Sequence, residues 1–115
     1  MWRLEKRARV YLDLGETDMR KGIQGLSAIV EMELEGELFS GDLFAFCNGK
    51  RDLIKILYYD RNGFALWQKR LAKDRFKWPE NDEEMLEVGK HELAWLLDGL
   101  DISQAHEKLR FKVGN

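Results

Sequence analysis

Residues Asp60–Pro79 read DRNGFALWQKRLAKDRFKWP, in which a tight turn, an aromatic strand and a run of basic residues follow one another. Asn62-Gly63 lies between two apolar-rich runs, a pattern typical of a two-residue β-hairpin loop. A type I′ turn needs positive φ at both central residues, which Asn tolerates and Gly adopts freely. The sequence therefore predicts an antiparallel hairpin with Asn62 and Gly63 as its loop.

The predicted loop fixes which residues face each other across the hairpin. The resulting pairs are Tyr58 with Trp67, Ile56 with Lys69, and Lys55 with Arg70. Like charges directly opposite each other on a sheet are unfavourable. The pair of Lys55 and Arg70 therefore predicts a positive surface that an anion neutralises. Two alternatives stay open, because a nearby Asp or Glu can neutralise this pair or a bulge can change the register.

The rest of the chain predicts an α+β fold. Runs of β-forming residues predict strands at residues 9–14, 43–47, 53–60, 64–72 and 85–88, and an edge strand at 107–113. Short polar turns join the strands that follow residue 43, which favours an antiparallel meander. We expect a β-meander of about four to six strands, packed against one longer N-terminal helix (about 18–34) and a short C-terminal helix (about 90–98).

The N-terminal helix is predicted from apolar residues that recur every three or four positions. They are Met19, Ile23, Leu26, Val30 and Leu34. Thr17 or Asp18 can supply the N-cap oxygen for the first turn. Gly22 and Gly25 lower the helix propensity, by about 1 kcal/mol each relative to Ala. We expect a close approach of this helix to the sheet to compensate for that cost.

The short C-terminal helix is predicted from three leucines that share one face. Leu93, Leu96 and Leu97 have helical spacing, and Gly99 follows them as a typical end of a helix. The single cysteine, Cys47, lies in a predicted strand and cannot form an internal disulfide. A buried small apolar side chain is its expected role, with a reactive thiol as the alternative.

The composition of the 115-residue chain is that of a folded, single-domain protein. Apolar residues make up 44% and charged residues 35%, and there is one Pro. We expect residues 1–115 to form one domain. No apolar run approaches the roughly 20 residues that span a bilayer, and the first residues lack the apolar segment of a secretory signal. The sequence therefore predicts a cytoplasmic protein without a membrane partner.

Charge is distributed in blocks along the chain, although the net charge is only −2. Residues 50–77 contain nine Lys or Arg and three Asp or Glu, a net charge of +6, while residues 31–49 and 78–115 each carry −5. This pattern can present one surface to an anionic partner and another to a basic partner. Alternatively, the blocks neutralise each other in the folded protein.

Basic and aromatic side chains alternate in and around the hairpin, which predicts a surface for nucleic acid. The candidate residues are Lys55, Arg61, Lys69, Arg70, Lys73, Arg75 and Lys77, with Trp67 and Trp78 as stacking surfaces. Lys and Arg can neutralise phosphates, and aromatic rings can stack on exposed bases. The competing interpretation is structural, because aromatic residues in strands usually form the core and neighbouring basic residues extend to water.

Catalytic chemistry finds little support in the sequence. His91 and His106 are isolated, with no second His or Cys at metal-ligand spacing. The chain contains no Gly-rich phosphate loop and no nucleophile elbow. Four aspartates near predicted element ends fit a metal-dependent nuclease, but they fit turn and helix caps better: Asp13, Asp18, Asp42 and Asp60. We expect no catalytic residues, no metal and no cofactor.

Five blocks of the sequence, in order, resemble a known family. They are TDMRKGIQGL at Thr17–Leu26, FSGDLFAF at Phe39–Phe46, KILYYDRNGFALWQKRL at Lys55–Leu71, RFKWP at Arg75–Pro79 and LAWLLDGLD at Leu93–Asp101. Together they are similar to the small accessory protein, often called TnpB, that the second open reading frame of the bacterial insertion sequence 66 family encodes. The resemblance covers nearly the whole chain.

The resemblance implies a role in DNA transposition. The implied partner is a separate, larger transposase of the same element, and this transposase carries the catalytic residues. The resemblance implies no catalytic residues in this chain. One hypothesis is a non-enzymatic accessory protein that contacts the DNA backbone through residues 50–77. The alternative is an adaptor that binds the transposase through the acidic segments Glu31–Asp42 and Glu80–Glu92. Edge strands at the termini could also pair two chains into a homodimer.

Overall fold

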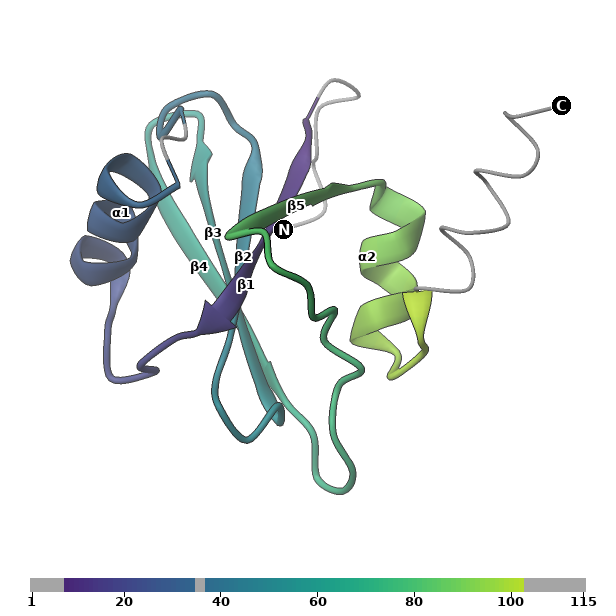
Figure 1. The fold of residues 1–115 in the computed structure, drawn as a ribbon. Coiled ribbons are helices and arrows are strands. Elements are labelled where there is room, and N and C mark those ends of the chain that lie inside the picture. Colours follow the sequence, from purple (N-terminus) through teal and green to yellow (C-terminus); the bar gives the residue numbers. More distant parts are fainter. Residues whose placement is uncertain (1–7, 35–36, 103–115) are drawn as a thin grey trace, which may run out of the picture.

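The computed structural model describes residues 8–34 and 37–102, which form a five-stranded sheet with a helix on each face (Figure 1). The elements are β1 (Val10–Glu16), α1 (Ile23–Met32), β2 (Leu43–Cys47), β3 (Leu53–Asp60), β4 (Gly63–Arg70), β5 (Met85–Val88) and α2 (Lys90–Leu97). The strand order is β4-β3-β2-β1-β5. The predicted α+β class is confirmed, and the strand predicted at residues 107–113 lies outside the described residues.

One strand pair departs from the predicted antiparallel meander. β2, β3 and β4 pair antiparallel, and β5 pairs antiparallel with β1, but β1 and β2 are parallel. The cause is α1, which connects β1 to β2. A helical crossover returns the chain to the starting end of the sheet, so the next strand runs in the same direction. The sheet is therefore mostly antiparallel, with one parallel pair.

The hairpin forms where it was predicted, but its register was predicted wrongly. Asp60 pairs with Gly63, so Arg61 and Asn62 form the loop, and Arg61 takes the positive φ of 58°. Lys55 consequently faces Gln68. Because like charges directly opposite each other are unfavourable, this register has an electrostatic advantage over the predicted one. The predicted apposition of Lys55 and Arg70 does not occur.

α1 is shorter than the predicted helix of about 18–34 and begins five residues later. The Asp18 carboxylate, which was a predicted cap, accepts a hydrogen bond from the Arg20 backbone N–H at 2.9 Å instead. The Thr17 backbone N–H donates to the Cys47 carbonyl oxygen at 3.0 Å. These bonds hold the chain in a turn before α1. Gly22 is the observed N-cap and has no side chain to form a capping hydrogen bond.

The predicted apolar face of α1 is only partly buried. Leu26 and Val30 are fully buried against the sheet, whereas the Ile23 residue is 38% exposed. The two glycines do not mark a close approach to the sheet. The atoms nearest a Cβ placed at Gly25 belong to the Lys21 side chain, and Gly22 has open space there. That prediction was wrong, because no atom of the sheet is among those nearest to either position.

The two faces of the sheet carry separate cores. On the α1 face, Phe44, Phe46 and Leu57 pack with the helix, while the α2 face holds the larger cluster. Leu93, Leu96 and Leu97, predicted to share one helix face, are buried on that second face. The predicted burial of Cys47, a free thiol, is confirmed. In such cores a Leu→Ala substitution costs about 2–5 kcal/mol. Both faces of the sheet are therefore covered by packed side chains.

Candidate functional site

Lys55, the centre of the predicted basic surface, is engaged inside the protein. It is only 9% exposed, and its Nζ donates hydrogen bonds to the carbonyl oxygens of Met19 at 2.8 Å and Lys21 at 3.1 Å. The side chain crosses from β3 to the turn that precedes α1. A buried ammonium group needs such partners, because leaving it unpaired is costly. The geometry therefore gives Lys55 a structural task.

Lys69 and Arg70, at the end of β4, also have partners within the protein. Lys69 Nζ donates to the Leu97 carbonyl oxygen at 2.8 Å, at the C-terminus of α2, where the helix dipole favours a positive charge. Arg70 forms an ion pair with Asp52 at 3.2 Å. The Asn48 side-chain amide donates to the same carboxylate, and this bond, together with the charge of Arg70, lowers the pKa of Asp52. Arg70 remains largely exposed in spite of its ion pair.

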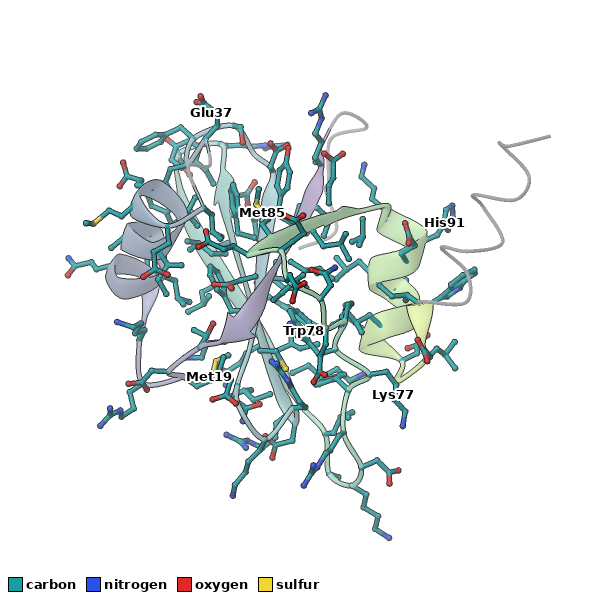
Figure 2. The ribbon with its side chains drawn as sticks, viewed as in Figure 1. Met19, Glu37, Lys77, Trp78, Met85 and His91 are labelled. Carbon is teal, nitrogen blue, oxygen red and sulfur yellow. The ribbon has the colours of Figure 1, made fainter. Side chains whose placement is uncertain are left out.

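The aromatic residues predicted to stack on bases face the interior. Trp78 is only 6% exposed, and its Nε1 donates to the Asp13 carbonyl oxygen at 2.9 Å. Figure 2 shows Trp78 directed into the molecule, whereas the neighbouring Lys77 points outward. Trp67 is half-buried and packs against the core on the α2 face. In the segment that joins β4 to β5, burial therefore alternates, with Phe76 and Trp78 inside and the basic residues outside.

The remaining basic candidates lie at opposite ends of the hairpin. Arg61 is in the turn between β3 and β4, whereas Lys73, Arg75 and Lys77 follow the far end of β4 (Figure 1). An eight-residue strand such as β4 spans about 26 Å at roughly 3.3 Å per residue. The structure thus separates Arg61 from the other three. One phosphate group cannot contact both sets.

Two loops meet at the end of the sheet opposite the hairpin turn. The Phe76 N–H donates to the Arg51 carbonyl oxygen at 2.7 Å, and the Leu71 N–H donates to the Asp52 carbonyl oxygen at 2.9 Å. These bonds hold the segment after β4 against the β2–β3 loop, which carries Lys50. We refer to the exposed basic side chains gathered here as the basic end: Lys50, Arg70, Lys73, Arg75 and Lys77.

The basic end borders a hollow of about 540 Å³. Lys73, Arg75 and Lys77 line it, and so do two carboxylates, Asp74 and Asp98. Among the described residues, the ion pairs involve none of these three basic side chains. Lys50 was not among the candidate residues predicted from the sequence. The contact between the two loops joins distant parts of the chain and has no local sequence signal.

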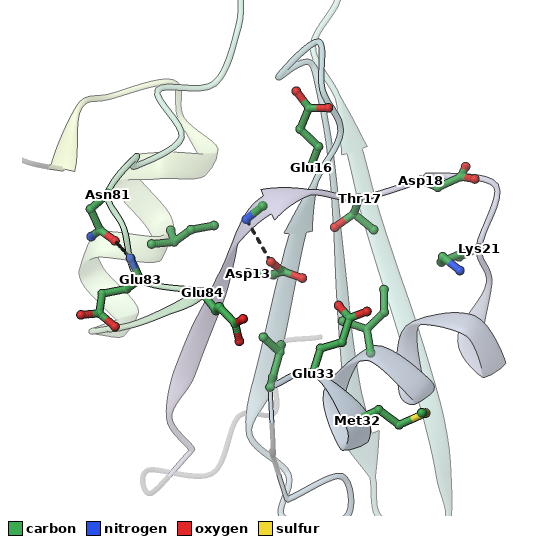
Figure 3. Close-up of a pocket in the computed structure, with 14 residues that line it drawn as sticks. Asp13, Glu16, Thr17, Asp18, Lys21, Met32, Glu33, Asn81, Glu83 and Glu84 are labelled. Atoms are coloured by element: carbon green, nitrogen blue, oxygen red, sulfur yellow. Dashed lines mark hydrogen bonds between the residues drawn. The ribbon is translucent and has the colours of Figure 1, made fainter.

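A larger cleft of about 870 Å³ opens between α1 and the segment that precedes β5 (Figure 3). Its polar lining comes from three parts of the chain: Asp13, Glu16, Thr17, Asp18 and Lys21 around the end of β1, Glu33 after α1, and Asn81, Glu83 and Glu84 before β5. We call it the acidic cleft. Glu33 belongs to one predicted acidic segment, and Glu83 and Glu84 belong to the other. Residues distant in the sequence are thus brought together.

Most carboxylates of the acidic cleft lack a cationic partner. Of the lining acids, only Asp18 takes part in an ion pair within the described residues, with Arg20 at 2.7 Å. Burial of Asp13, reinforced by the charges of Glu33 and Glu84, raises the pKa of its carboxyl group despite the hydrogen bond from the Gly15 N–H. Thr17 is only 6% exposed, and its hydroxyl has no hydrogen-bond partner in the described part of the chain. The cleft therefore has an excess of negative charge.

Within residues 8–34 and 37–102, no cluster of three or more His, Cys, Asp or Glu side chains is arranged to hold a metal ion. Likewise, none of the helices in these ranges has the length and apolar character needed to cross a membrane. The carboxylates of the acidic cleft are spread along its walls. The cleft therefore carries negative charge, but its described carboxylates are not arranged as the ligands of a metal ion.

Both surfaces lie within a stretch that matches a known family. A model of the family described as "IS66 Orf2 like protein" matches residues 8–107. The chain belongs to the IS66 Orf2-like family. This confirms the resemblance of the five sequence blocks, and it makes the protein an accessory protein of an IS66-type insertion sequence. The basic end and the acidic cleft are thus both parts of the family's region of the chain.

Two curated relatives from Sinorhizobium fredii (strain NBRC 101917 / NGR234) are similar over most of the IS66 Orf2-like chain. The uncharacterized protein y4hO is 35% identical over 107 residues, covering 92% of this chain and 93% of the relative. The uncharacterized protein y4jC is 29% identical over 100 residues, covering 87% and 86%. No solved structure is significantly similar to the chain.

Proposed function

We propose that this IS66 Orf2-like protein is a non-enzymatic accessory factor of transposition that assists a separate transposase and contacts the DNA backbone through the basic end. Lys73, Arg75 and Lys77 are the main contacts, with Lys50 beside them. Arg70 contributes charge near the same surface. Lys55, Lys69, Trp67 and Trp78 support the fold in this proposal, and Arg61 lies too far away to share the same contact.

One observation carries the proposal. The two loops at the end of the sheet are joined by backbone hydrogen bonds, so that Lys50 and the three basic residues after β4 share one exposed surface. Phosphate contacts of this kind need exposed Lys and Arg side chains, and they need no base-reading groups. Burial of Trp78 argues for backbone contact in place of base stacking. The buried indole keeps Lys77, on the neighbouring position, directed outward.

The test measures binding to duplex DNA from the ends of the element by fluorescence anisotropy over a series of salt concentrations. If Lys50, Lys73, Arg75 and Lys77 each neutralise one phosphate, log affinity falls with log salt at a slope of about −3.6. The triple variant Lys73→Ala/Arg75→Ala/Lys77→Ala removes three of these contacts, so we expect a slope of about −0.9. Unchanged affinity of this variant, or no binding by the wild type at low salt, refutes the proposal.

A matched control has the same change in net charge at other places. Arg9→Ala/Arg61→Ala/Lys90→Ala alters residues before β1, in the hairpin turn and at the start of α2, which lie away from the basic end in Figure 1. We expect this variant to retain the wild-type slope. If both triple variants weaken binding equally, the attraction is a general effect of net charge and the basic end has no special role.

A second candidate function is an adaptor that binds the transposase through the two acidic segments. The observation that favours it is the acidic cleft, where Glu33 from one segment and Glu83 and Glu84 from the other line the same cavity. The two candidates make different predictions. A transposition assay in which the basic-end variant retains full activity, while a variant of the cleft loses it, favours the adaptor.

A further inference from the structure

The acidic cleft combines a large negative charge with few internal cations. Setting aside Asp18, which pairs with Arg20, five carboxylates and one ammonium group, that of Lys21, line it. Besides burial, the charges of Glu33 and Glu84 raise the pKa of Asp13, so carboxylates from three parts of the chain lie close enough to interact. Unneutralised carboxylates held together repel one another. A cation that enters the cleft relieves this repulsion.

Thr17 provides a second, independent indication of a ligand. Its residue is more than nine-tenths buried, and its hydroxyl has no partner among the described residues. In Figure 3 the hydroxyl oxygen is directed between the carboxylates of Asp13 and Glu33. A buried polar group without a hydrogen bond is costly in a folded protein. A donor group that reaches into the cleft between these acids would satisfy it.

The lining also indicates the shape of the cation. The carboxylates do not form a metal-binding cluster in the described ranges. Apolar side chains, among them Leu14, Ile29 and Met32, share the walls with the acids. Lys and Arg side chains have an apolar stem and a charged head, so they match such a mixed surface. A cavity of about 870 Å³ is in the range that accepts a ligand of several side chains.

We propose that the acidic cleft is a receptor for an arginine-bearing segment of a protein partner, with the guanidinium group between Asp13, Glu33 and Glu84. Arginine fits better than lysine because its planar head has five N–H donors and can bind carboxylates in pairs. One of these donors would reach the Thr17 hydroxyl. The proposal rests on the adaptor function and gives it a site and a ligand chemistry, and it is independent of DNA contact by the basic end.

The probe is acetylated tetra-arginine amide, titrated into the full chain and followed by amide chemical shifts and calorimetry at about 0.1 M salt, where charges are screened beyond roughly 10 Å. We expect shifts of residues 13–18, 33 and 83–84. Tetra-citrulline, which keeps the shape but lacks the charge, is expected not to bind. Equal binding of both peptides, or no binding of tetra-arginine, overturns the proposal.

Two variants identify the contacts. Asp13→Asn/Glu33→Gln/Glu84→Gln removes three charges but keeps the acceptor for the Gly15 N–H, and we expect binding to weaken by at least about tenfold. Thr17→Val removes only the buried hydroxyl, and we expect about tenfold weaker binding without loss of stability. The control Glu31→Gln/Glu37→Gln/Glu80→Gln has the same change in charge at exposed residues outside the cleft. If this control weakens binding as much as the cleft variant does, the proposal is wrong.

The same variants separate this proposal from the others. DNA affinity of the cleft variant is expected to equal or exceed that of the wild type, because the substitutions remove negative charge. If tetra-arginine fails to bind but the cleft variant still loses transposition activity, the adaptor function survives and the arginine receptor does not. If tetra-arginine binds at the cleft and transposition is unaffected by the cleft variant, the site is real but the adaptor function fails.

Discussion

The substitution Lys55→Met tests whether the most central basic residue supports the fold. Met keeps most of the apolar stem but removes the ammonium group that binds the carbonyl oxygens of Met19 and Lys21. Leaving buried acceptors without donors costs about 1–3 kcal/mol, whereas burying the uncharged Met side chain avoids the desolvation of an ammonium group. We therefore expect the free energy of unfolding to decrease by about 2 kcal/mol. Unfolding entropy near 2.1 cal/mol/K per residue then gives a decrease in Tm of about 8 °C for a chain of this length.

The assay is urea unfolding of Lys55→Met beside Lys73→Met, which changes an exposed lysine. We expect the midpoint of Lys55→Met to fall with an unchanged m value, and the control to stay within about 0.5 kcal/mol of the wild type. Hydrogen exchange of the Lys21 amide, which donates to the Asp18 carbonyl oxygen, should accelerate because the turn before α1 loses its tether. A Lys55→Met protein that is as stable as the wild type but binds DNA more weakly refutes the structural role.

Three further predictions concern buried groups. Burial raises the pKa of Cys47 to about 11, so about 0.1% of it is thiolate at pH 8, and thiol reagents should label the folded protein at least a hundredfold more slowly than a free cysteine with a pKa near 8.5. Trp78→Phe removes the bond to the Asp13 carbonyl oxygen and part of the packing, and should lower the free energy of unfolding by about 2 kcal/mol in urea titrations. Because the folded pKa of Asp13 is raised, the contribution of this carboxyl group to the free energy of unfolding should fall as the pH rises above the unfolded value near 3.9. Relative to the wild type, Asp13→Asn should therefore be more stable at pH 7 than at pH 3, and a difference that is independent of pH would contradict this assignment.

The elements that were predicted correctly are those with a local signal. The leucine face of α2, the run Met85–Val88 and the three strands of the β2–β3–β4 meander each follow from residues within a few positions of one another. The hairpin turn was found because Asn62-Gly63 is a strong local pattern. Its register was missed because the choice between two loops one residue apart depends on which side chains meet across the strands, including Lys55 with Gln68.

The surfaces could not be predicted because they depend on contacts between distant parts of the chain. The sequence placed Lys55 on an exposed strand surface. In the structure, its ammonium group binds the turn at Met19 and Lys21, which lies more than 30 positions earlier in the chain. Charge counting did find the basic block at residues 50–77 and the two acidic segments. It could not show that Glu33 and Glu84 line one cavity, because that requires the parallel crossover between β1 and β2, which carries α1 across the sheet.

Trp78, which was predicted as a stacking surface, is a core residue that connects the basic end to the acidic cleft. The chain leaves the basic end at Lys77, buries the Trp78 indole on the α2 face, and reaches Asn81 and Glu83 at the wall of the acidic cleft. The indole N–H binds the carbonyl oxygen of Asp13, whose carboxylate lines the same cleft. One buried side chain therefore positions the basic loop on one side and the acidic wall on the other. In the two functions proposed above, this arrangement would hold an anionic and a cationic partner at a fixed relative orientation.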